Sequence, residues 1–338
     1  MAATIKDVAR QANVSVATVS RYVNGTHKVR GKTAERVKAA IEALGFRPNA
    51  VGRSLSTAHT KTLGVVIPSI SNPVFADAVA GITDEVKQQG YTLMLTSTNY
   101  DPDEEAAVVG TLLENRVDGV ILTVADPEKS PALTLLEQAG IPSVLIYNQP
   151  AGAYATVTVD NVEAGREVAR TFAGLGHQKL GMISGRFKAS DRALARRDGF
   201  VDGACKAGLE NPVICETDHE GRHMEQSLDD LFSDPANAPT ALFCSNDLLA
   251  ISVIGYLRKR DIPVPDRVSV IGFDGIAVGS HLHPALTTVV QPSREMGSAA
   301  ARHLLAQLSG DASPEVMLLP FKVRMGDSAG PAGKLSPA

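Results

Sequence analysis

From residue 63 onward, continuous apolar runs alternate with amphipathic segments. The first series comprises "LGVVIP", "FADAVAGITDEVKQQG", "YTLMLTS", "EEAAVVGTLLENR", "VDGVILT", "ALTLLEQAG" and "IPSVLIYN", and a second series of similar size begins near Asp160. Continuous β-rich runs are typical of strands that are buried on both faces of a parallel sheet, with crossover helices between them. Two consecutive series therefore predict two α/β lobes, each a doubly wound parallel sheet, with a cleft between them.

Three short helical patterns precede the lobes. Thr4 and Asp7 form a capping box that opens the first helix, Ser15 is a good N-cap for the second, and Gly45 ends the third. This spacing predicts a small all-α headpiece whose first two helices form a helix-turn-helix. In such a unit the second helix enters the major groove of DNA.

The charge of the chain is unevenly distributed. Residues 1–60 hold ten Lys and Arg against three Asp and Glu, which is +7, whereas the whole chain carries −4 and the remaining residues therefore −11. A basic head on an acidic body indicates that the head binds a polyanion and the body does not. The alternative is a basic face that is merely solvated.

The predicted second helix presents base-reading chemistry on one side. Val16 and Ala17 lie at its exposed N-terminal end, and Arg21 lies one turn beyond Ala17. Arginine pairs bidentately with guanine, and small aliphatic groups pack on thymine methyl groups. Short donors near the helix ends suit phosphate contacts. The predicted phosphate contacts are Thr4, Ser15, Thr18, Ser20, Tyr22 and Asn24. The alternative is an ordinary bundle with a surface arginine.

The stretch "TIKDVARQANVSVATVSRYVNG", followed by "GFRPNAVGRSL", resembles the signature of the LacI/GalR family of bacterial transcription regulators, and the resemblance extends to about residue 325. It implies a body similar to periplasmic sugar-binding proteins and a homodimer that reads near-palindromic, double-stranded operator DNA. It also implies base reading by Val16, Ala17 and Arg21. No cofactor or metal is implied.

The resemblance assigns further DNA contacts outside the second helix. Asn24 and Lys28 flank the base-reading residues, and Leu55 matches a hinge leucine that inserts into the minor groove at the operator centre. An apolar wedge of this kind unstacks a base step and bends the duplex. Ser56, beside it, is also expected to contact DNA. The alternative for Leu55 is docking onto the lobe.

The resemblance also places an effector site in the cleft. A flat ring with Arg, Asn and Asp around it suits a polyhydroxylated ligand. Tyr147 stands where many sugar-responsive relatives have an aspartate, which favours an anionic ligand such as a sugar acid. For each polar residue the alternative is a loop or capping role. The predicted effector contacts are Asn72, Phe75, Tyr147, Arg192, Arg196, His219, Asn246 and Asp274.

Other functions are weighed against this one. The sequence has no GxSxG elbow, P-loop or metal-ligand cluster, so the chain is not expected to be an enzyme. A transport protein would require export, and it would leave the helix-turn-helix unexplained. A regulator controlled by a partner protein remains open. We predict a transcriptional repressor whose operator affinity is controlled allosterically by a sugar or sugar acid.

The expected boundaries follow from these patterns. We expect a headpiece over 1–47, a hinge helix and linker over 48–61, a core over 62–325 and a disordered Gly/Pro/Ser-rich tail over 326–338. Within the core, the N-lobe comprises 62–160 and 292–321 and the C-lobe 161–291 and 322–325.

Composition also predicts the compartment. Cys205, Cys215 and Cys244 lack the count or spacing of a disulfide framework, and we expect buried thiols in a reducing environment. The N-terminus lacks an apolar signal region, and no apolar run is long enough to span a membrane. These features predict a cytoplasmic protein.

Overall fold

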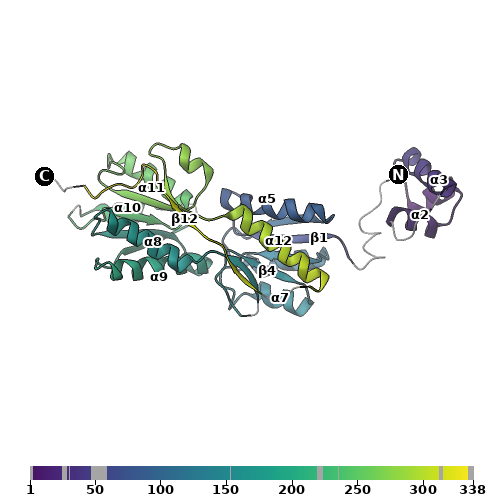
Figure 1. Ribbon diagram of the computed structural model, residues 1–338, viewed down its shortest axis with the longest axis horizontal. Helices are drawn as coiled ribbons and strands as arrows, with labels where there is room; N and C mark the ends of the chain where they lie inside the picture. The colour runs from purple at the N-terminus through teal and green to yellow at the C-terminus, as the bar shows by residue number, and fades with distance from the viewer. Residues whose placement is uncertain are drawn as a thin grey trace. The chain divides into compact units, whose positions relative to one another are not determined.

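The computed structural model describes residues 3–24, 29, 31–46, 59–152, 154–218, 224–234, 236–311 and 315–333. The chain divides into two compact units, Met1–Lys61 and Thr62–Ala338. The first unit is the helical headpiece, and the second is a two-lobed α/β core (Figure 1).

The headpiece contains α1 (Ile5–Ala12), α2 (Val16–Asn24) and α3 (Lys32–Leu44). Its core is small: Val8, Val19 and Val37, one from each helix, are fully buried together. The predicted local signals explain the helix ends, because the Thr4–Asp7 capping box is present and Gly45 ends α3 in the left-handed conformation.

The N-lobe is a six-stranded sheet with the order β11-β5-β4-β3-β1-β2, and all its strand pairs are parallel. Helices α5 and α12 cover one face, and α6 and α7 cover the other. Both faces are thus buried, as the continuous apolar runs predicted. Its elements are β1 (Thr62–Ile67), α5 (Pro73–Gln88), β2 (Thr92–Ser97), α6 (Glu104–Glu114), β3 (Gly119–Leu122), α7 (Pro131–Ala139), β4 (Ser143–Ile146), β5 (Ala155–Thr158), α12 (Ser293–Ser309) and β11 (Val316–Leu318).

The C-lobe repeats this plan with the strand order β12-β10-β9-β8-β6-β7, in which only the edge strand β12 is antiparallel to its neighbour. Helices α8 and α9 cover one face, and α10 and α11 cover the other. Its elements are α8 (Asn161–Gly174), β6 (Leu180–Gly185), η1 (Phe187–Ala189), α9 (Asp191–Lys206), β7 (Val213–Thr217), α10 (Glu225–Phe232), β8 (Ala241–Cys244), α11 (Asp247–Lys259), β9 (Ser269–Asp274), η2 (Ala277–His281), β10 (Thr287–Val290) and β12 (Lys322–Arg324).

The chain passes between the lobes three times. The crossings follow β5, follow β10, and join β11 in the N-lobe sheet to β12 in the C-lobe sheet (Figure 1). Two lobes joined by three connecting segments can change their relative angle while each keeps its own core. The carboxyl ends of the parallel strands face the cleft, where ligands bind in such folds.

One helix pair of the C-lobe requires glycine. A Cβ at Gly199 of α9 would lie 1.9 Å from the Val162 carbonyl oxygen, and one at Gly165 of α8 would lie 2.2 Å from the Arg196 carbonyl oxygen. The backbones of α8 and α9 therefore touch, which larger residues would prevent. This contact fixes the turn of α9 that carries Arg196.

The predicted disordered tail is wrong over 326–333. Ser328 is fully buried, its hydroxyl donates to the Val270 carbonyl oxygen at 2.6 Å, and the Val270 amide donates to the Ser328 carbonyl oxygen at 2.7 Å. Farther along, the buried ring of His177 lies 3.1 Å from the Gly330 carbonyl oxygen. Small residues let this segment pack closely against strand β9, so its composition reflects tight packing rather than disorder. Residues 334–338 lie outside the described part.

The cysteines differ from one another. Cys244 is buried and Cys215 is half-buried, but Cys205 is exposed on α9, so the expectation that all three are buried thiols is wrong for Cys205. Among the described residues, no helix is long and apolar enough to cross a membrane.

Candidate DNA-reading face and ligand cleft

In the headpiece, three features stabilise the turn between α1 and α2. Asn13 ends α1 in the left-handed conformation with φ 49°, and the Ser15 hydroxyl accepts from the Thr18 amide at 3.2 Å, which caps α2. Arg36 of α3 donates to the carbonyl oxygens of Ala12 and Asn13. These bonds fix the start of α2 relative to the other two helices.

The face of α2 opposite the core is exposed. Val19 packs inward, whereas Val16, Ala17 and Arg21 are exposed, and the Val16 side chain keeps 42% of its accessible surface. Single apolar residues are common on protein surfaces, so Val16 matters here because it shares this exposed face with Ala17 and Arg21. The exposed residues are the three predicted to read bases.

The predicted phosphate contacts are placed near the same helix ends. Thr4 and Ser15 are exposed, although both hydroxyls also serve as caps, and Thr18 and Ser20 are half-buried. The ring of Tyr22 packs partly against the headpiece core. Asn24 is the last residue of α2. Four predicted residues lie outside the described part of the chain, namely Lys28, Leu55, Ser56 and His219.

In the core, a small cavity lies between the lobes. Seven of the eight predicted effector residues line it, and the eighth is His219. Four further polar residues were not predicted: Tyr100, Ser190, Ser245 and Gln291. Each follows a strand that ends at the cleft or precedes the helix after such a strand. The rule that ligands bind at strand carboxyl ends, applied to the run "TTVVQP", would have found Gln291.

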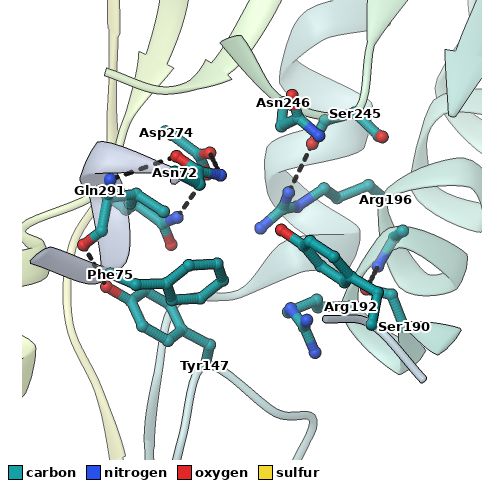
Figure 2. Close-up of a pocket in the computed structure, with 13 residues that line it drawn as sticks. Asn72, Phe75, Tyr147, Ser190, Arg192, Arg196, Ser245, Asn246, Asp274 and Gln291 are labelled. Atoms are coloured by element: carbon teal, nitrogen blue, oxygen red, sulfur yellow. Dashed lines mark hydrogen bonds between the residues drawn. The ribbon is translucent and has the colours of Figure 1, made fainter. Parts of the chain in front are cut away.

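Asp274 is the most constrained of these residues. It ends β9 with a φ of 115°, which is a strained conformation for a residue with a side chain. Its carboxylate accepts from the Gln291 amide nitrogen at 2.8 Å and from the Asn72 amide nitrogen at 3.2 Å (Figure 2). Burial raises the pKa of Asp274 to about 6, against the opposing effect of Arg196.

Asn72 and Asn246 both cap helices, which is the predicted alternative to a ligand role. Asn72 caps α5 through the Val74 amide, and Asn246 caps α11 through the Leu249 amide. Asn72 still has an amide group directed at Asp274, across the cleft from its own lobe. Both asparagines also line the cavity, so capping and cavity-lining roles coexist at these two positions.

Arg196 is held in a fixed orientation. Its Nε donates to the Asn161 side-chain oxygen at 2.9 Å, its Nη1 donates to the Ser245 carbonyl oxygen at 2.6 Å, and its guanidinium lies 3.4 Å from the centre of the Phe273 ring. Burial lowers the pKa of Arg196 to about 10, which leaves it charged at neutral pH. A fixed guanidinium of this kind is suited to hydroxyl or carboxylate oxygens.

The other wall of the cavity is aromatic. The rings of Phe75 and Tyr147 are nearly perpendicular, with centroids 5.4 Å apart, and the Tyr147 hydroxyl donates to the Val74 carbonyl oxygen at 3.0 Å (Figure 2). Burial raises the pKa of the Tyr147 hydroxyl well above its usual range and that of Tyr100 to about 12. Both phenols are therefore neutral and serve as apolar walls with a polar tip.

The combination of a helix-turn-helix unit with a two-lobed α/β core defines the class of DNA-binding regulators built on a periplasmic-binding-protein fold. Residues 4–49 match the model of bacterial regulatory proteins of the lacI family, and residues 60–325 match that of periplasmic binding proteins and the sugar-binding domain of the LacI family. The chain therefore belongs to the LacI family.

Individual relatives agree with this assignment. The chain is 34% identical over 309 residues to the HTH-type transcriptional repressor PurR of Photobacterium profundum, covering 90% of this chain and 92% of the relative. Among solved structures, the lac repressor dimer bound to operator and the anti-inducer ONPF has a TM-score of 0.86 at 25% identity, covering 98% of this chain and 100% of the other. The transcriptional regulator CelR in complex with cellobiose has a TM-score of 0.72 at 27% identity, covering 96% and 99%.

These similarities establish what the chain does in outline. It is a DNA-binding transcriptional repressor of the LacI family, and the relatives named here are transcriptional regulators rather than enzymes. The predicted fold class is confirmed, with an all-α helix-turn-helix headpiece and two α/β lobes with parallel sheets.

Proposed function

We propose that this repressor is a homodimer that reads a near-palindromic operator and releases or binds it in response to a sugar or sugar acid in the cleft. The observation that carries the proposal is the set of side chains that line the cavity between the lobes. It combines an aromatic wall with fixed guanidinium and amide groups. This combination suits a ring that bears several hydroxyl groups.

An unpartnered acceptor supports the ligand class. The side-chain amide of Gln291 donates a hydrogen bond to Asp274 through its nitrogen, and its remaining polar atom is the carbonyl oxygen. That oxygen is buried and has no hydrogen-bond partner within the described residues. A buried acceptor without a partner costs free energy, and a ligand hydroxyl would supply the missing donor. The relative CelR, whose solved complex contains cellobiose, is consistent with such a ligand.

The charges around the cavity favour neither a neutral sugar nor a sugar acid. Arg192 and Arg196 bring two positive charges, and Asp191 and Asp274 bring two carboxylates close to them. The Asp191 carboxylate offsets the preference for an anion that Tyr147 and the arginines predict. Both ligand classes therefore belong to the proposal.

The DNA side of the proposal rests on the exposed face of α2. Val16, Ala17 and Arg21 would meet base edges, and Leu55 from each chain would open the operator centre. Coupling of about 1 to 3 kcal/mol between the cleft and the DNA would change operator affinity by about 5- to 150-fold. That range is sufficient to switch a promoter.

A paired screen tests the proposal. Thermal unfolding is measured with a panel of neutral sugars and sugar acids, and each compound is then added to the protein bound to a DNA site selected from a random pool. A ligand at a hundredfold excess over its Kd should stabilise the protein by about 2.7 kcal/mol. The same ligand should also change DNA affinity. If no member of either class shifts the melting temperature or the DNA affinity, the proposal fails and control by a partner protein replaces it.

A further inference from the structure

One residue of the C-lobe forms three hydrogen bonds to the N-lobe. Asp191, at the start of α9, donates its amide to the Ala125 carbonyl oxygen at 2.8 Å. Its carboxylate accepts from the Gln149 amide at 2.6 Å and from the Asn148 side-chain nitrogen at 2.9 Å. Ala125 lies in the loop after β3, and the other two follow β4. A single residue thus joins two loops of the opposite lobe.

The N-lobe half of this contact is firmly built. Asn148 is fully buried and exchanges two further bonds with the backbone of Val124, at 2.7 and 3.0 Å. The buried carboxylate of Glu105 accepts from the Ala125 amide at 2.6 Å and from the Ser130 hydroxyl at 3.0 Å. The loops that receive Asp191 are therefore held in place by their own lobe.

The contact is also buried and charged. The Asp191 side chain keeps only 12% of its accessible surface, and Arg192 Nη1 lies 3.4 Å from its carboxylate. Arg192 Nη1 also donates to the Val124 carbonyl oxygen at 3.3 Å, which is a fourth bond between the lobes. Hydrogen bonds to a buried carboxylate are stronger than neutral ones because the medium around them screens little.

This contact differs from the bond between the lobes that lies in the cavity lining. Asn72 and Asp274, which hydrogen-bond across the cleft, both line the cavity, so a ligand there would compete with that bond. Asp191, Asn148 and Gln149 do not line the cavity. The Asp191 carboxylate and its two N-lobe partners therefore lie outside the set of residues that a ligand in the cavity would touch.

We infer that Asp191 is a latch that holds the two lobes closed without any ligand. Asp191 is thus a positioning residue: it sets the fraction of molecules in the closed form, and it places Arg192 at the cavity wall. The apparent affinity of any ligand that prefers the closed form scales with that fraction. The latch acts on the cleft of the proposed function, but its effect on lobe closure does not depend on whether a sugar binds there.

The test measures the distance between the lobes in the ligand-free, full-length protein. Spin labels are attached to the native exposed Cys205 of the C-lobe and to Gln138→Cys on α7 of the N-lobe, with the half-buried Cys215 replaced by serine. Pulsed dipolar spectroscopy then gives the distance distribution for this labelled parent and for the same protein with Asp191→Ala or Asp191→Asn. Asp198→Asn, on the exposed side of the same helix, is the matched control.

We expect one dominant distance in the parent and in the Asp198→Asn control. Asp191→Ala should add a population at a different distance and lower the ratio of closed to open molecules by about tenfold or more, because hydrogen bonds to a charged group are lost. Asp191→Asn should have a smaller effect in the same direction. Circular dichroism checks that each variant is folded. If folded Asp191→Ala and Asp191→Asn both keep the parent distance distribution, the latch is disproved, whatever the metabolite screen shows.

Discussion

The two candidate sites of this repressor are built in opposite ways. The candidate DNA-reading face comes from one helix of nine residues, α2, and the three side chains predicted to read bases are exposed. The cleft draws its side chains from the ends of many strands, and Asn72 and Asp274, which meet there, lie 202 positions apart in the chain. The first site is formed by neighbouring residues of one helix that are exposed to solvent. The second is formed by residues far apart in the chain that hydrogen-bond to one another.

The consequence is a difference in how each site can fail. A side chain of the exposed face can be removed without disturbing its neighbours, because no other described side chain depends on Val16, Ala17 or Arg21 for packing in the headpiece core. In the cleft, the polar groups hydrogen-bond to one another, as Arg196 does to the Asn161 side chain and the Ser245 carbonyl oxygen. Substitutions should therefore act locally on the face and collectively in the cleft.

The largest expected effect comes from a position outside the cavity. Gly199→Val would place side-chain atoms where the Val162 carbonyl oxygen lies, 1.9 Å from the ideal Cβ, and would force α8 away from α9. We expect a loss of about 3 to 5 kcal/mol of stability, or failure to fold. Denaturant unfolding measures this loss. Gly110→Ala, where a Cβ meets nothing within 4 Å, is the control and should not destabilise. Equal stability of the two variants would show that the helix contact can relax.

The next largest effect is on the cleft itself. Arg196→Ala removes the donor to the Asn161 side-chain oxygen and to the Ser245 carbonyl oxygen, and it removes the positive charge that lowers the pKa of Asp274. Ligand affinity should fall by about a hundredfold or more, since charged hydrogen bonds are lost and buried groups are left unpaired. Calorimetry with the metabolite that stabilises the parent measures this change. Affinity for DNA in the DNA-binding form should be unchanged, and an intact ligand response would move the site elsewhere.

Asp274 also predicts a pH dependence. Its pKa is raised to about 6 in the folded protein from 3.8, so the folded state binds the proton more tightly than the unfolded state. The stability that this group contributes is present below pH 4 and is lost as the pH rises to about 6, a change of roughly 2 to 3 kcal/mol.

Asp274→Asn removes this titration. The stability of the variant relative to the parent should therefore rise between pH 4 and pH 6 and then level off. Urea unfolding at a series of pH values measures the difference, with the exposed Asp198→Asn as the reference. A difference that falls with pH over this window would reverse the sign assigned to Asp274.

The smallest expected effect is on the exposed face. Arg21→Ala should cost about 1 to 3 kcal/mol of discrimination at one symmetric base pair of the operator, because a bidentate contact with guanine is lost. Binding assays against operator variants measure this change, and the thermal stability of the headpiece should stay the same. Uniform weakening across all sequences would instead make Arg21 a phosphate contact.

The sequence predicted the headpiece better than the cleft for a physical reason. Helix caps such as Thr4 with Asp7 and Ser15 with Thr18 join residues three positions apart, so they can be found by spacing alone. The family resemblance placed Asn72 and Asp274 at the cleft, and this agrees with the rule that ligands bind beyond the carboxyl ends of the strands. Neither rule says which strand ends meet across the lobes.

Long-range pairing explains what the sequence did not reveal. Asp191 opens a helix, and nothing near it in the chain indicates that its partners are Asn148 and Gln149 of the other lobe. The composition of the segment after residue 325 predicts disorder, yet Ser328 is buried because it exchanges two hydrogen bonds with the backbone of Val270. In both cases the partner lies more than 40 positions away.

By itself the sequence determined the class of fold, the helix-turn-helix and the side of α2 that faces outward, because periodicity and capping are local properties of the chain. Only the tertiary structure decided which polar groups meet in the cleft. It showed that Asp191 compensates Arg192 and joins the lobes, since hydrogen bonds across a buried interface depend on where distant strands end.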